Sequence, residues 1–273
     1  MDRYAVIGNP IGHSKSPRIH AAFAAQTGQQ LRYDALLAPL DGFVATALDF
    51  RDGGGRGLNV TVPFKLEAFA LADRRTPRAE AAGAVNTLAF GADGILGDNT
   101  DGAGILRDIT VNLGCPIAGK PVLLLGAGGA ARGTVLPLLD AAPAELVVAN
   151  RTAAKAVDLA AAFATPGRLA PTGCGFAALA GRRFDVVINA TSASLADAAP
   201  DLPPGLYAPG SLAYDMMYGK GDTPFLAAAR AQGAARLADG LGMLVEQAAE
   251  SFALWRGVRP DTAPVLTALR ADL

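Results

Sequence analysis

Residues 121–131 read PVLLLGAGGAA, and this stretch decides the fold of the second half of the chain. Residues 121–125 form a continuous apolar run, which is typical of a parallel strand buried on both faces. A glycine-rich turn follows, and a helix is predicted from about Ala130 to Leu139. A strand, a tight turn and a helix N-terminus in this order gather backbone N–H groups in a geometry that binds a pyrophosphate. The stretch therefore predicts a dinucleotide-binding α/β domain.

The small residues of the turn each have a place in this prediction. Gly126 permits the tight bend, and Gly128 lets a phosphate approach the backbone. Ala131 stands where the third small residue of G-x-G-x-x-G allows close helix packing. The cofactor-binding residues predicted in this turn are Gly126, Ala127, Gly128, Gly129 and Ala130.

The end of the next strand indicates which dinucleotide binds. An acidic residue there would accept a hydrogen bond from a ribose 2′-hydroxyl, but this chain has Asn150, followed by Arg151, Thr152 and Lys155. Arginine and lysine are suited to a 2′-phosphate, so NADP is favoured over NAD. Alternatively, the two cations belong to a solvated helix start. Basic residues there oppose the helix dipole, which favours a bound anion.

The rest of the chain divides into two α/β halves. The second half alternates strands and helices in the manner of repeated βαβ units, with strands at PVLLLG, ELVVAN, DVVINAT, SLAYDMMY and ARLADG. A helix over Gly102–Leu113 begins this half, and the chain is helical again from Leu241 to about Arg256. The first half has predicted helices at Ser16–Thr27 and Leu40–Phe50, and predicted strands at RYAVIG, LRYDALL, LNVTVP, AVNTLAF and GILGDN. The run Gly53–Gly55 is predicted to be a loop.

The composition excludes several classes of function. The chain has 273 residues, 24 basic and 25 acidic, and no long run of one sign, which disfavours nucleic acid as a partner. Apolar stretches are interrupted well before the roughly 18 residues of a membrane span. The two cysteines lack metal-ligand spacing, and the two histidines have no acidic cluster nearby, so a metal site is not expected. A reducing, cytoplasmic location is the simplest interpretation.

The segment 58–65, LNVTVPFK, presents candidate chemistry in the first half. Asn59 and Thr61 are two residues apart and are expected on one face of a strand, with Val60 and Val62 facing a core. Lys65 follows directly, where the strand ends and a helix would start. A solvated lysine is the alternative, so the segment by itself leaves its function open.

Three other polar patches precede the dinucleotide half. Ser14 and Ser16 could offer two hydroxyls to a carboxylate, although Ser16 before Pro17 is also an ordinary helix N-cap signal. Asn86 is a polar residue in an apolar strand. Asp101 lies at the junction of the halves, where it could face a cleft or simply cap the following helix.

These motifs together resemble the shikimate dehydrogenase family. The matching segments occur in the family's order over nearly the whole chain: GNPIGHSKSP, NVTVPFK, GAVNTL, GDNTDG, GAGGAA, NRT, NATS, YDMMY and DGLGMLVEQA. The resemblance implies NADP-dependent, reversible reduction of 3-dehydroshikimate to shikimate in aromatic amino-acid biosynthesis. It implies a substrate-binding catalytic domain over 1–101, completed by helices in 241–273, and a Rossmann-like NADP domain over 102–240, with the active site in the cleft between them.

Residue roles follow from the same resemblance. Lys65 and Asp101 would be the catalytic pair, and Ser14 and Ser16 would bind the substrate carboxylate. Asn59, Thr61, Asn86, Asp101, Tyr218 and Gln247 would bind the other substrate groups. The cofactor would be lined by Gly126–Ala130, Asn150, Arg151, Thr152, Lys155, Thr191, Met216 and Gly240.

Two other functions remain open from the sequence. One is a paralogue that oxidises quinate, or both acids; Asn150-Arg151 and the Ser14/Ser16 pair argue against it. The other is a non-catalytic NADP-binding sensor, and the presence of both Lys65 and Asp101 argues against that. We expect small-molecule partners only, and either a monomer or a homodimer.

Overall fold

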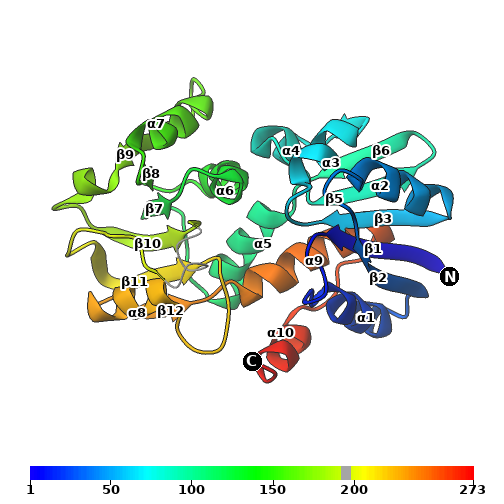
Figure 1. Cartoon of the computed structure of the whole chain (residues 1–273). Coiled ribbons are helices and arrows are strands. Elements are labelled where there is room, and N and C mark those ends of the chain that lie inside the picture. The colour runs from blue at the N-terminus through cyan, green and yellow to red at the C-terminus, as the bar shows by residue number, and fades with distance from the viewer. Residues whose placement is uncertain (192–197) are drawn as a thin grey trace. The chain divides into compact units, whose positions relative to one another are not determined.

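The computed structural model describes residues 1–191 and 198–273, so Ser192 of the NATS motif lies outside the described residues. The chain folds into two compact units (Figure 1). The first unit comprises Met1–Gly104 and Val245–Asp272, and the second comprises Ile105–Leu244 with Leu273. Both units are α/β, as the sequence predicts.

The first unit is built on a mixed sheet in the order β2-β1-β3-β5-β6-β4. The strands β1, β2 and β3 run parallel, β5 is antiparallel to both β3 and β6, and β4 runs parallel to β6. The strands are β1 (Asp2–Gly8), β2 (Leu31–Leu37), β3 (Gly55–Val60), β4 (Arg74–Arg75), β5 (Thr87–Gly91) and β6 (Gly94–Asp98). The helices are α1 (Ser16–Thr27), α2 (Phe43–Asp52), α3 (Lys65–Leu71), α4 (Pro77–Ala82), and α9 (Leu241–Arg256) and α10 (Ala263–Arg270) from the C-terminal part of the chain.

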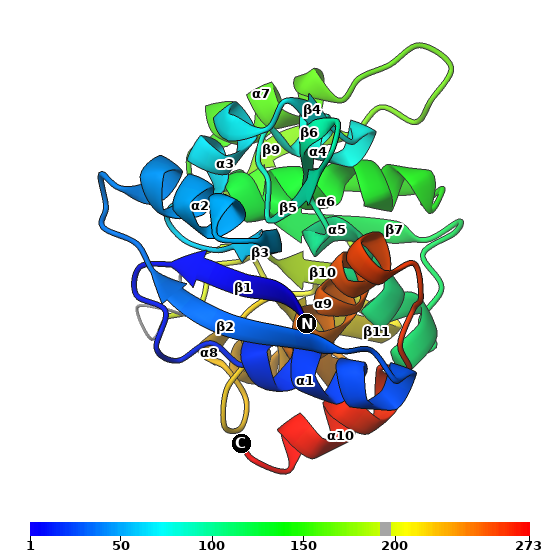
Figure 2. The ribbon, with the colours of Figure 1, turned by 90° about the vertical axis from the view of Figure 1, so that its right-hand side faces the viewer.

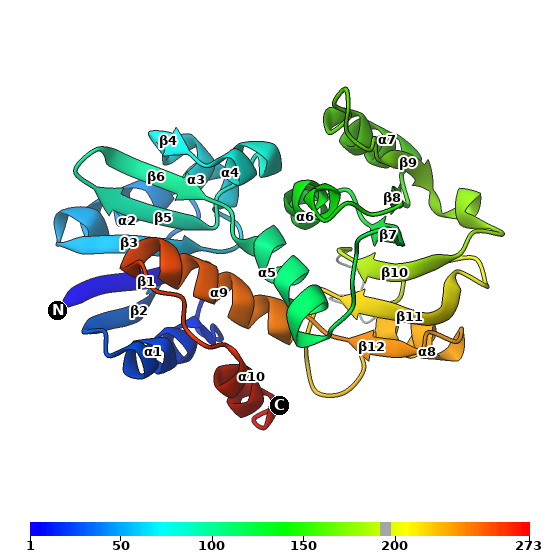
Figure 3. The ribbon, with the colours of Figure 1, turned by 180° about the vertical axis from the view of Figure 1, so that it is seen from behind.

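Helices cover both faces of this sheet, with α1 and α2 on opposite sides of β1 and β2 (Figure 2). Leu58 and Val60 of β3 pack in the core with Phe43 and Phe64. The alternate residues Gly57 and Asn59 face α9. This helix lies along the other side of the sheet (Figure 3). A Cβ on Gly57 would lie 2.4 Å from the Trp255 Nε1 atom, so glycine is needed for this approach.

Aromatic side chains fill the space between α9 and the first sheet. The Trp255 ring stacks on Tyr4 at 4.7 Å, and its Nε1 donates to the Leu88 carbonyl at 3.0 Å. Phe252 contacts His20 and Phe23 of α1. This burial fixes α9 on the first sheet, although the helix follows the dinucleotide half in sequence.

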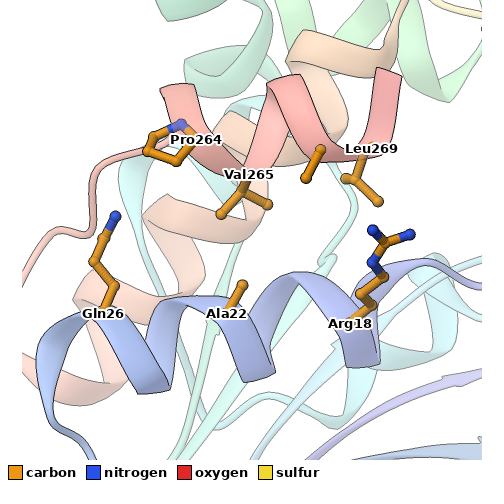
Figure 4. A pocket seen from close by; sticks show the side chains of 7 residues that line it. Arg18, Ala22, Gln26, Pro264, Val265 and Leu269 are labelled. Carbon is orange, nitrogen blue, oxygen red and sulfur yellow. The ribbon is translucent and has the colours of Figure 1, made fainter. Parts of the chain in front are cut away.

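A groove of about 340 Å³ separates α1 from α10 at the surface of the first unit (Figure 4). Arg18 forms an ion pair with Asp272 in this region, and the Gln26 Oε1 atom accepts from the Asp261 N–H at 2.7 Å. The side chains that line this groove are mostly aliphatic: Arg18, Ala22, Gln26, Pro264, Val265, Ala268 and Leu269.

The second unit contains a sheet in the order β12-β11-β10-β7-β8-β9, with every pair parallel. When β7 to β12 are numbered 1 to 6 along the chain, the sheet read from β9 to β12 has the strand order 3-2-1-4-5-6. This is the arrangement of a Rossmann dinucleotide-binding domain. Its strands are β7 (Pro121–Leu125), β8 (Glu145–Asn150), β9 (Thr172–Gly175), β10 (Phe184–Asn189), β11 (Tyr207–Asp215) and β12 (Arg236–Ala238). Helix α5 (Asp101–Arg107) begins in the first unit and ends in the second. The other helices of the second unit are a π-helix (Asp108–Asn112), α6 (Gly129–Asp140), α7 (Ala153–Ala162), a 3₁₀-helix (Phe176–Leu179) and α8 (Pro224–Ala231).

The β7 strand shows why its sequence is uniformly apolar. Residues Val122, Leu123, Leu124 and Leu125 are all fully buried, so both faces of the strand are covered. The predicted Rossmann-like fold is confirmed by this burial and by the strand order.

Several local predictions in the first half were wrong. The strand predicted over 58–63 begins at Gly55 and ends at Val60, so Thr61 lies one residue beyond it. Residues 62–64 form a turn with a cis Val62–Pro63 bond, and Val62 is 62% exposed rather than part of a core. The loop predicted over Gly53–Gly55 was wrong at Gly55, which is the first residue of β3. Only glycine fits there, because a Cβ would lie 2.3 Å from the Phe50 ring.

The helix predicted over 102–113 begins at Asp101 and changes to a π-helix at Asp108. The predicted start of the helix at Leu40 was early, since α2 begins at Phe43. Among the described residues, no helix combines the length and apolar character that crossing a bilayer requires.

His20 is a buried histidine in the core of the first unit. The ring is 1% exposed and stacks on Tyr33 at 4.1 Å. Burial lowers the pKa of His20 to about 3, although the nearby Asn59 amide offsets part of that effect. Because the folded pKa lies below the unfolded value of about 6.5, protons bind preferentially to the unfolded chain below that pH.

We therefore expect His20→Phe to reduce the loss of stability in mild acid. Wild-type protein should lose about 2 kcal/mol of unfolding free energy between pH 7 and 5 through His20 alone. Urea unfolding at both pH values measures this loss, which should largely disappear in the variant. His13→Phe, at an exposed position, is the matched control and should keep the wild-type loss. An equal pH dependence in all three proteins would contradict the assignment.

Candidate active site

Lys65 and Asp101 form an ion pair in the first unit. Lys65 is the first residue of α3, directly after the turn at 62–64, and Asp101 is the first residue of α5. The Lys65 Nζ atom lies 2.6 Å from the Asp101 Oδ2 atom, and the side chains are 32% and 14% exposed. Both groups are therefore held together while remaining partly accessible to a ligand.

The Asn86 side-chain amide holds the other oxygen of this carboxylate. Its Nδ2 atom donates to the Asp101 Oδ1 atom at 2.8 Å and to the Thr100 Oγ1 atom at 2.9 Å. Its Oδ1 atom accepts from the Thr100 N–H and from the Thr87 hydroxyl, both at 2.9 Å. A backbone N–H can only donate, so the orientation of the amide is determined. Asp101 is thus fixed at both oxygens, by Lys65 and by Asn86.

Gln247 reaches this cluster from α9. Its Oε1 atom lies 3.3 Å from the Asn86 Nδ2 atom and 3.4 Å from the Thr100 hydroxyl. The structure therefore brings together four residues from four separate segments of the sequence: Lys65, Asn86, Asp101 and Gln247.

Asn59 lies deeper, in a fully connected polar network. Its Nδ2 atom donates to the Ser251 hydroxyl at 2.8 Å and to the Thr87 hydroxyl at 3.1 Å. Its Oδ1 atom accepts from the Tyr33 hydroxyl at 2.7 Å. Both amide hydrogens are used within the protein, so the Oδ1 atom is what remains for a substrate hydroxyl.

Sequence reasoning missed four members of this network: Tyr33, Thr87, Thr100 and Ser251. The spacing from Gln247 to Ser251 carried a usable signal, because residues four apart share one face of a helix. Tyr33 and Thr100 gave no such signal. Their hydrogen-bond partners, Asn59 and Asn86, come from other parts of the chain and are brought close only by the order of the strands in the sheet.

Ser14 and Ser16 lie in the loop after β1 and at the start of α1. The Ser14 Oγ atom accepts from the Ser16 N–H at 3.2 Å. Lys15 occupies the N-cap position and its side chain makes no capping hydrogen bond, so the simple N-cap alternative for Ser16 was wrong. Burial raises the pKa of Tyr33 well above its usual value, and the nearby Ser16 hydroxyl opposes this shift.

Thr61 lies at the same edge of the sheet as the β1 loop. Its N–H donates to the Ile7 carbonyl at 3.0 Å, and its methyl group would meet a Cβ on Gly8 at 2.5 Å. Because β1 and β3 are parallel, their carboxyl ends place Thr61 next to the segment that leads to Ser14 and Ser16.

The glycine turn of the second unit has the predicted form. Gly126 has φ +109°, and a Cβ there would lie 3.0 Å from the Ala190 carbonyl oxygen. Gly128 is the N-cap of α6, and residues Gly128, Gly129 and Ala130 are exposed. Nothing lies within 4 Å of a Cβ built on Gly128 or Gly129, so the start of this 12-residue helix is open to an anion.

The predicted 2′-phosphate residues lie at the end of β8, beside the glycine turn. The Asn150 Nδ2 atom donates to the Thr152 carbonyl at 3.0 Å. Arg151 and Lys155 are exposed, and within the described part of the chain neither forms an ion pair. Two exposed cations at this position suit a phosphate.

Thr191, Met216 and Gly240 gather at the carboxyl ends of β10, β11 and β12. The Met216 N–H donates to the Asn189 carbonyl at 3.0 Å. The Gly240 N–H donates to the Met217 carbonyl at 3.0 Å, and a Cβ on Gly240 would lie 2.1 Å from the Met216 carbonyl oxygen. Only glycine fits there.

Tyr218 lies in the second unit, whereas the other predicted substrate residues lie in the first. Burial raises the pKa of its hydroxyl, and the Asp239 carboxylate adds to the shift.

Comparison with known proteins gives a consistent family assignment. Three family models match the chain: the shikimate dehydrogenase substrate-binding domain over residues 6–88, the shikimate/quinate 5-dehydrogenase domain over 111–196, and the shikimate 5′-dehydrogenase C-terminal domain over 240–270. The shikimate dehydrogenase (NADP⁺) of Aromatoleum aromaticum is 72% identical over 100% of this chain and 98% of its own length.

Solved structures agree. An Ael1 enzyme from Pseudomonas putida has a TM-score of 0.93 at 56% identity, covering 98% of each chain. Shikimate 5-dehydrogenase from Thermus thermophilus, solved in complex with NADP(H) and shikimate, has a TM-score of 0.88 at 35% identity, covering 100% of each chain. Identity of this extent over the full chain shows that the protein belongs to the shikimate dehydrogenase family.

Proposed function

We propose that this protein is an oxidoreductase that catalyses the NADP-dependent interconversion of 3-dehydroshikimate and shikimate. The observation that carries the proposal is the Lys65–Asp101 ion pair at 2.6 Å, with Asp101 held from its other side by Asn86. These residues occur in a chain that is 72% identical to a shikimate dehydrogenase (NADP⁺).

The residues of the second unit fit a dinucleotide. The glycine turn leaves the N-terminus of α6 open for a pyrophosphate, and Arg151 and Lys155 offer cations for a 2′-phosphate. Thr191, Met216 and Gly240 would complete the site at the ends of the neighbouring strands. When bound, the nicotinamide supplies or accepts the hydride.

Lys65 would handle the proton that accompanies this hydride. In the reducing direction its ammonium donates a proton to the carbonyl oxygen of the substrate, or stabilises the charge that develops there. Asp101 holds the ammonium in position and favours its charged form. In the oxidising direction the same amine accepts the alcohol proton.

The first unit would bind the rest of the substrate. We assign the carboxylate to the hydroxyls of Ser14 and Ser16. The ring hydroxyls would be bound by Asn59 through its Oδ1 atom, and by Thr61, Asn86, Asp101 and Gln247. Tyr218 of the second unit would also bind a substrate hydroxyl.

A four-way assay tests this function. Purified protein is supplied with shikimate or quinate and with NADP⁺ or NAD⁺, and the absorbance of the reduced cofactor is followed. We expect the highest kcat/KM with shikimate and NADP⁺, and consumption of NADPH with 3-dehydroshikimate. Preference for quinate would indicate the paralogous activity, and NADP⁺ binding without turnover of either acid would indicate a sensor.

Removal of the catalytic pair should act on the chemical step. We expect Lys65→Ala to lower kcat roughly 10²- to 10⁴-fold with a much smaller change in KM for shikimate, because the amine acts on charge that develops in the transition state. Asp101→Asn should lower kcat to a similar extent. The double variant should be little worse than the worse single one, since a coupled pair acts as a unit.

Lys120→Ala provides the matched control for these variants. Lys120 also pairs with an aspartate, Asp185, at 3.1 Å, but in the second unit at the amino end of β7. This variant should keep the wild-type kcat. Near-normal kcat in Lys65→Ala would overturn the proposed role of Lys65.

Cofactor choice should depend on Arg151 and Lys155. Replacing both with glutamine should raise KM for NADP⁺ by roughly 10- to 100-fold, because exposed charge-assisted hydrogen bonds are partly screened. KM for NAD⁺ should change little. Steady-state kinetics with both cofactors measures the ratio, and Arg183→Gln, an exposed arginine at the amino end of β10, should leave it unchanged. Equal losses with the two cofactors would contradict the assignment.

A further inference from the structure

Asp215 is a buried carboxylate at the carboxyl end of β11. It is 0% exposed. Its Oδ1 atom accepts from the Asn189 Nδ2 atom at 3.1 Å and from the Met217 N–H at 3.1 Å. Its Oδ2 atom accepts from the Thr223 hydroxyl at 2.5 Å. We name Asn189, Asp215, Met217 and Thr223 the Asp215 cluster.

The carboxylate determines the orientation of the Asn189 amide. Because a carboxylate only accepts, the Nδ2 atom must face Asp215 and the Oδ1 atom must face away from it. That Oδ1 atom accepts from the Thr191 N–H at 3.1 Å and from the Thr191 hydroxyl at 2.7 Å. The backbone carbonyl of Asn189 also accepts from the Met216 N–H at 3.0 Å. Asp215 therefore acts on Thr191 through Asn189.

The same carboxylate ties both ends of the segment 216–223. Met217 is near the start of this segment and Thr223 is its last residue, directly before α8. Thr223 is also the N-cap of α8, since its Oγ1 atom accepts from the Leu226 N–H at 3.3 Å. The segment carries Met216 and Tyr218, and the Gly240 N–H bonds to its Met217 carbonyl at 3.0 Å.

We infer that Asp215 is a positioning residue for the dinucleotide site. It acts through Asn189 on Thr191 and directly on the segment that carries Met216, so three strand ends keep one arrangement before the cofactor binds. The cofactor identity used here rests on the proposed function. The physical reason is that removing the acceptor leaves buried donors without a partner, which costs more than losing an exposed hydrogen bond.

NADPH binding tests this inference without relying on turnover. Titration calorimetry and cofactor fluorescence give Kd for the full-length wild type and for Asp215→Asn, Thr223→Val and Thr223→Ser, each well below its melting temperature. We expect Kd to rise by up to roughly 10- to 150-fold in Thr223→Val and in Asp215→Asn, the range for losing one buried hydrogen bond to a charged group. Thr223→Ser keeps the hydroxyl and should stay within about 2-fold of wild type.

Two controls separate positioning from general loss of stability. Asp222→Asn removes an exposed carboxylate of the same segment, which pairs with Arg230 of α8, and it should not change Kd. Asp108→Asn removes a buried carboxylate of the same unit, which accepts from the Tyr214 hydroxyl at 2.7 Å. It should lower the melting temperature but leave Kd near the wild-type value.

The preference for NADPH over NADH should stay the same in every variant of the Asp215 cluster, because Arg151 and Lys155 lie outside the cluster. Wild-type Kd in Thr223→Val and Asp215→Asn, or an equal rise in Asp108→Asn, would overturn the inference. If Asp215→Asn does not fold, the inference is tested by the difference in NADPH Kd between Thr223→Val and Thr223→Ser, and equal Kd values in these two variants would overturn it. Failure to oxidise shikimate with NADPH binding intact would refute the proposed function alone.

Discussion

Asn86 is buried directly before the start of β5 and contacts the start of α5, and each atom of its amide has a fixed partner. The Thr100 N–H and the Thr87 hydroxyl determine where the oxygen lies, so the nitrogen must face Asp101 and Thr100. Buried polar groups are costly unless they are paired, and here the pairing holds the carboxylate that in turn holds Lys65. The candidate active site depends on this one amide orientation.

Helix α9 completes that arrangement. It supplies Gln247 beside Asn86 and Ser251 between Asn59 and Thr87. Its position on the first sheet is stabilised by burial of Phe252 and Trp255 and by a charged network. Arg78 bonds to Asp98 of β6 at 2.5 Å and to Glu250 of α9 at 3.2 Å.

In this charged network, hydrogen bonds to Asp98 outweigh the effect of burial on its charge. Burial opposes its charge, but hydrogen bonds from Arg78, Thr76 and the Asn99 N–H hold the pKa of the carboxyl below its usual value. The charged form is therefore retained in the folded protein. An unpaired charge at this position would cost far more than the pair, so the network fixes α9 relative to β6 as well as stabilising it.

The second unit reaches its arrangement by a different route. Parallel strands put all their carboxyl ends at one edge, and the strand order reverses between β7 and β10. This reversal is where open α/β sheets bind ligands. The glycine turn, Asn150 and the Asp215 cluster all lie at that edge, so topology alone assembles them.

The sequence by itself determined the features that depend on neighbours along the chain. The apolar run before GAGGAA predicts a buried parallel strand and an anion-binding turn, and Asn150-Arg151 predicts preference for a 2′-phosphate. The helix over Ser16–Thr27 has the bounds that the sequence predicts. The motif order predicts the family, which the comparisons confirm.

Only the tertiary structure decided the features that depend on contacts between distant residues. Val62 is exposed and Thr61 lies outside its strand because a turn, and not alternation, follows Val60. The sequence gives no signal for the roles of Tyr33, Thr100 and Asp215, since a hydroxyl or carboxylate gains its role from the partners that burial imposes. Periodicity and propensity describe local geometry, whereas hydrogen-bond satisfaction in a core is set by elements that are adjacent only after folding.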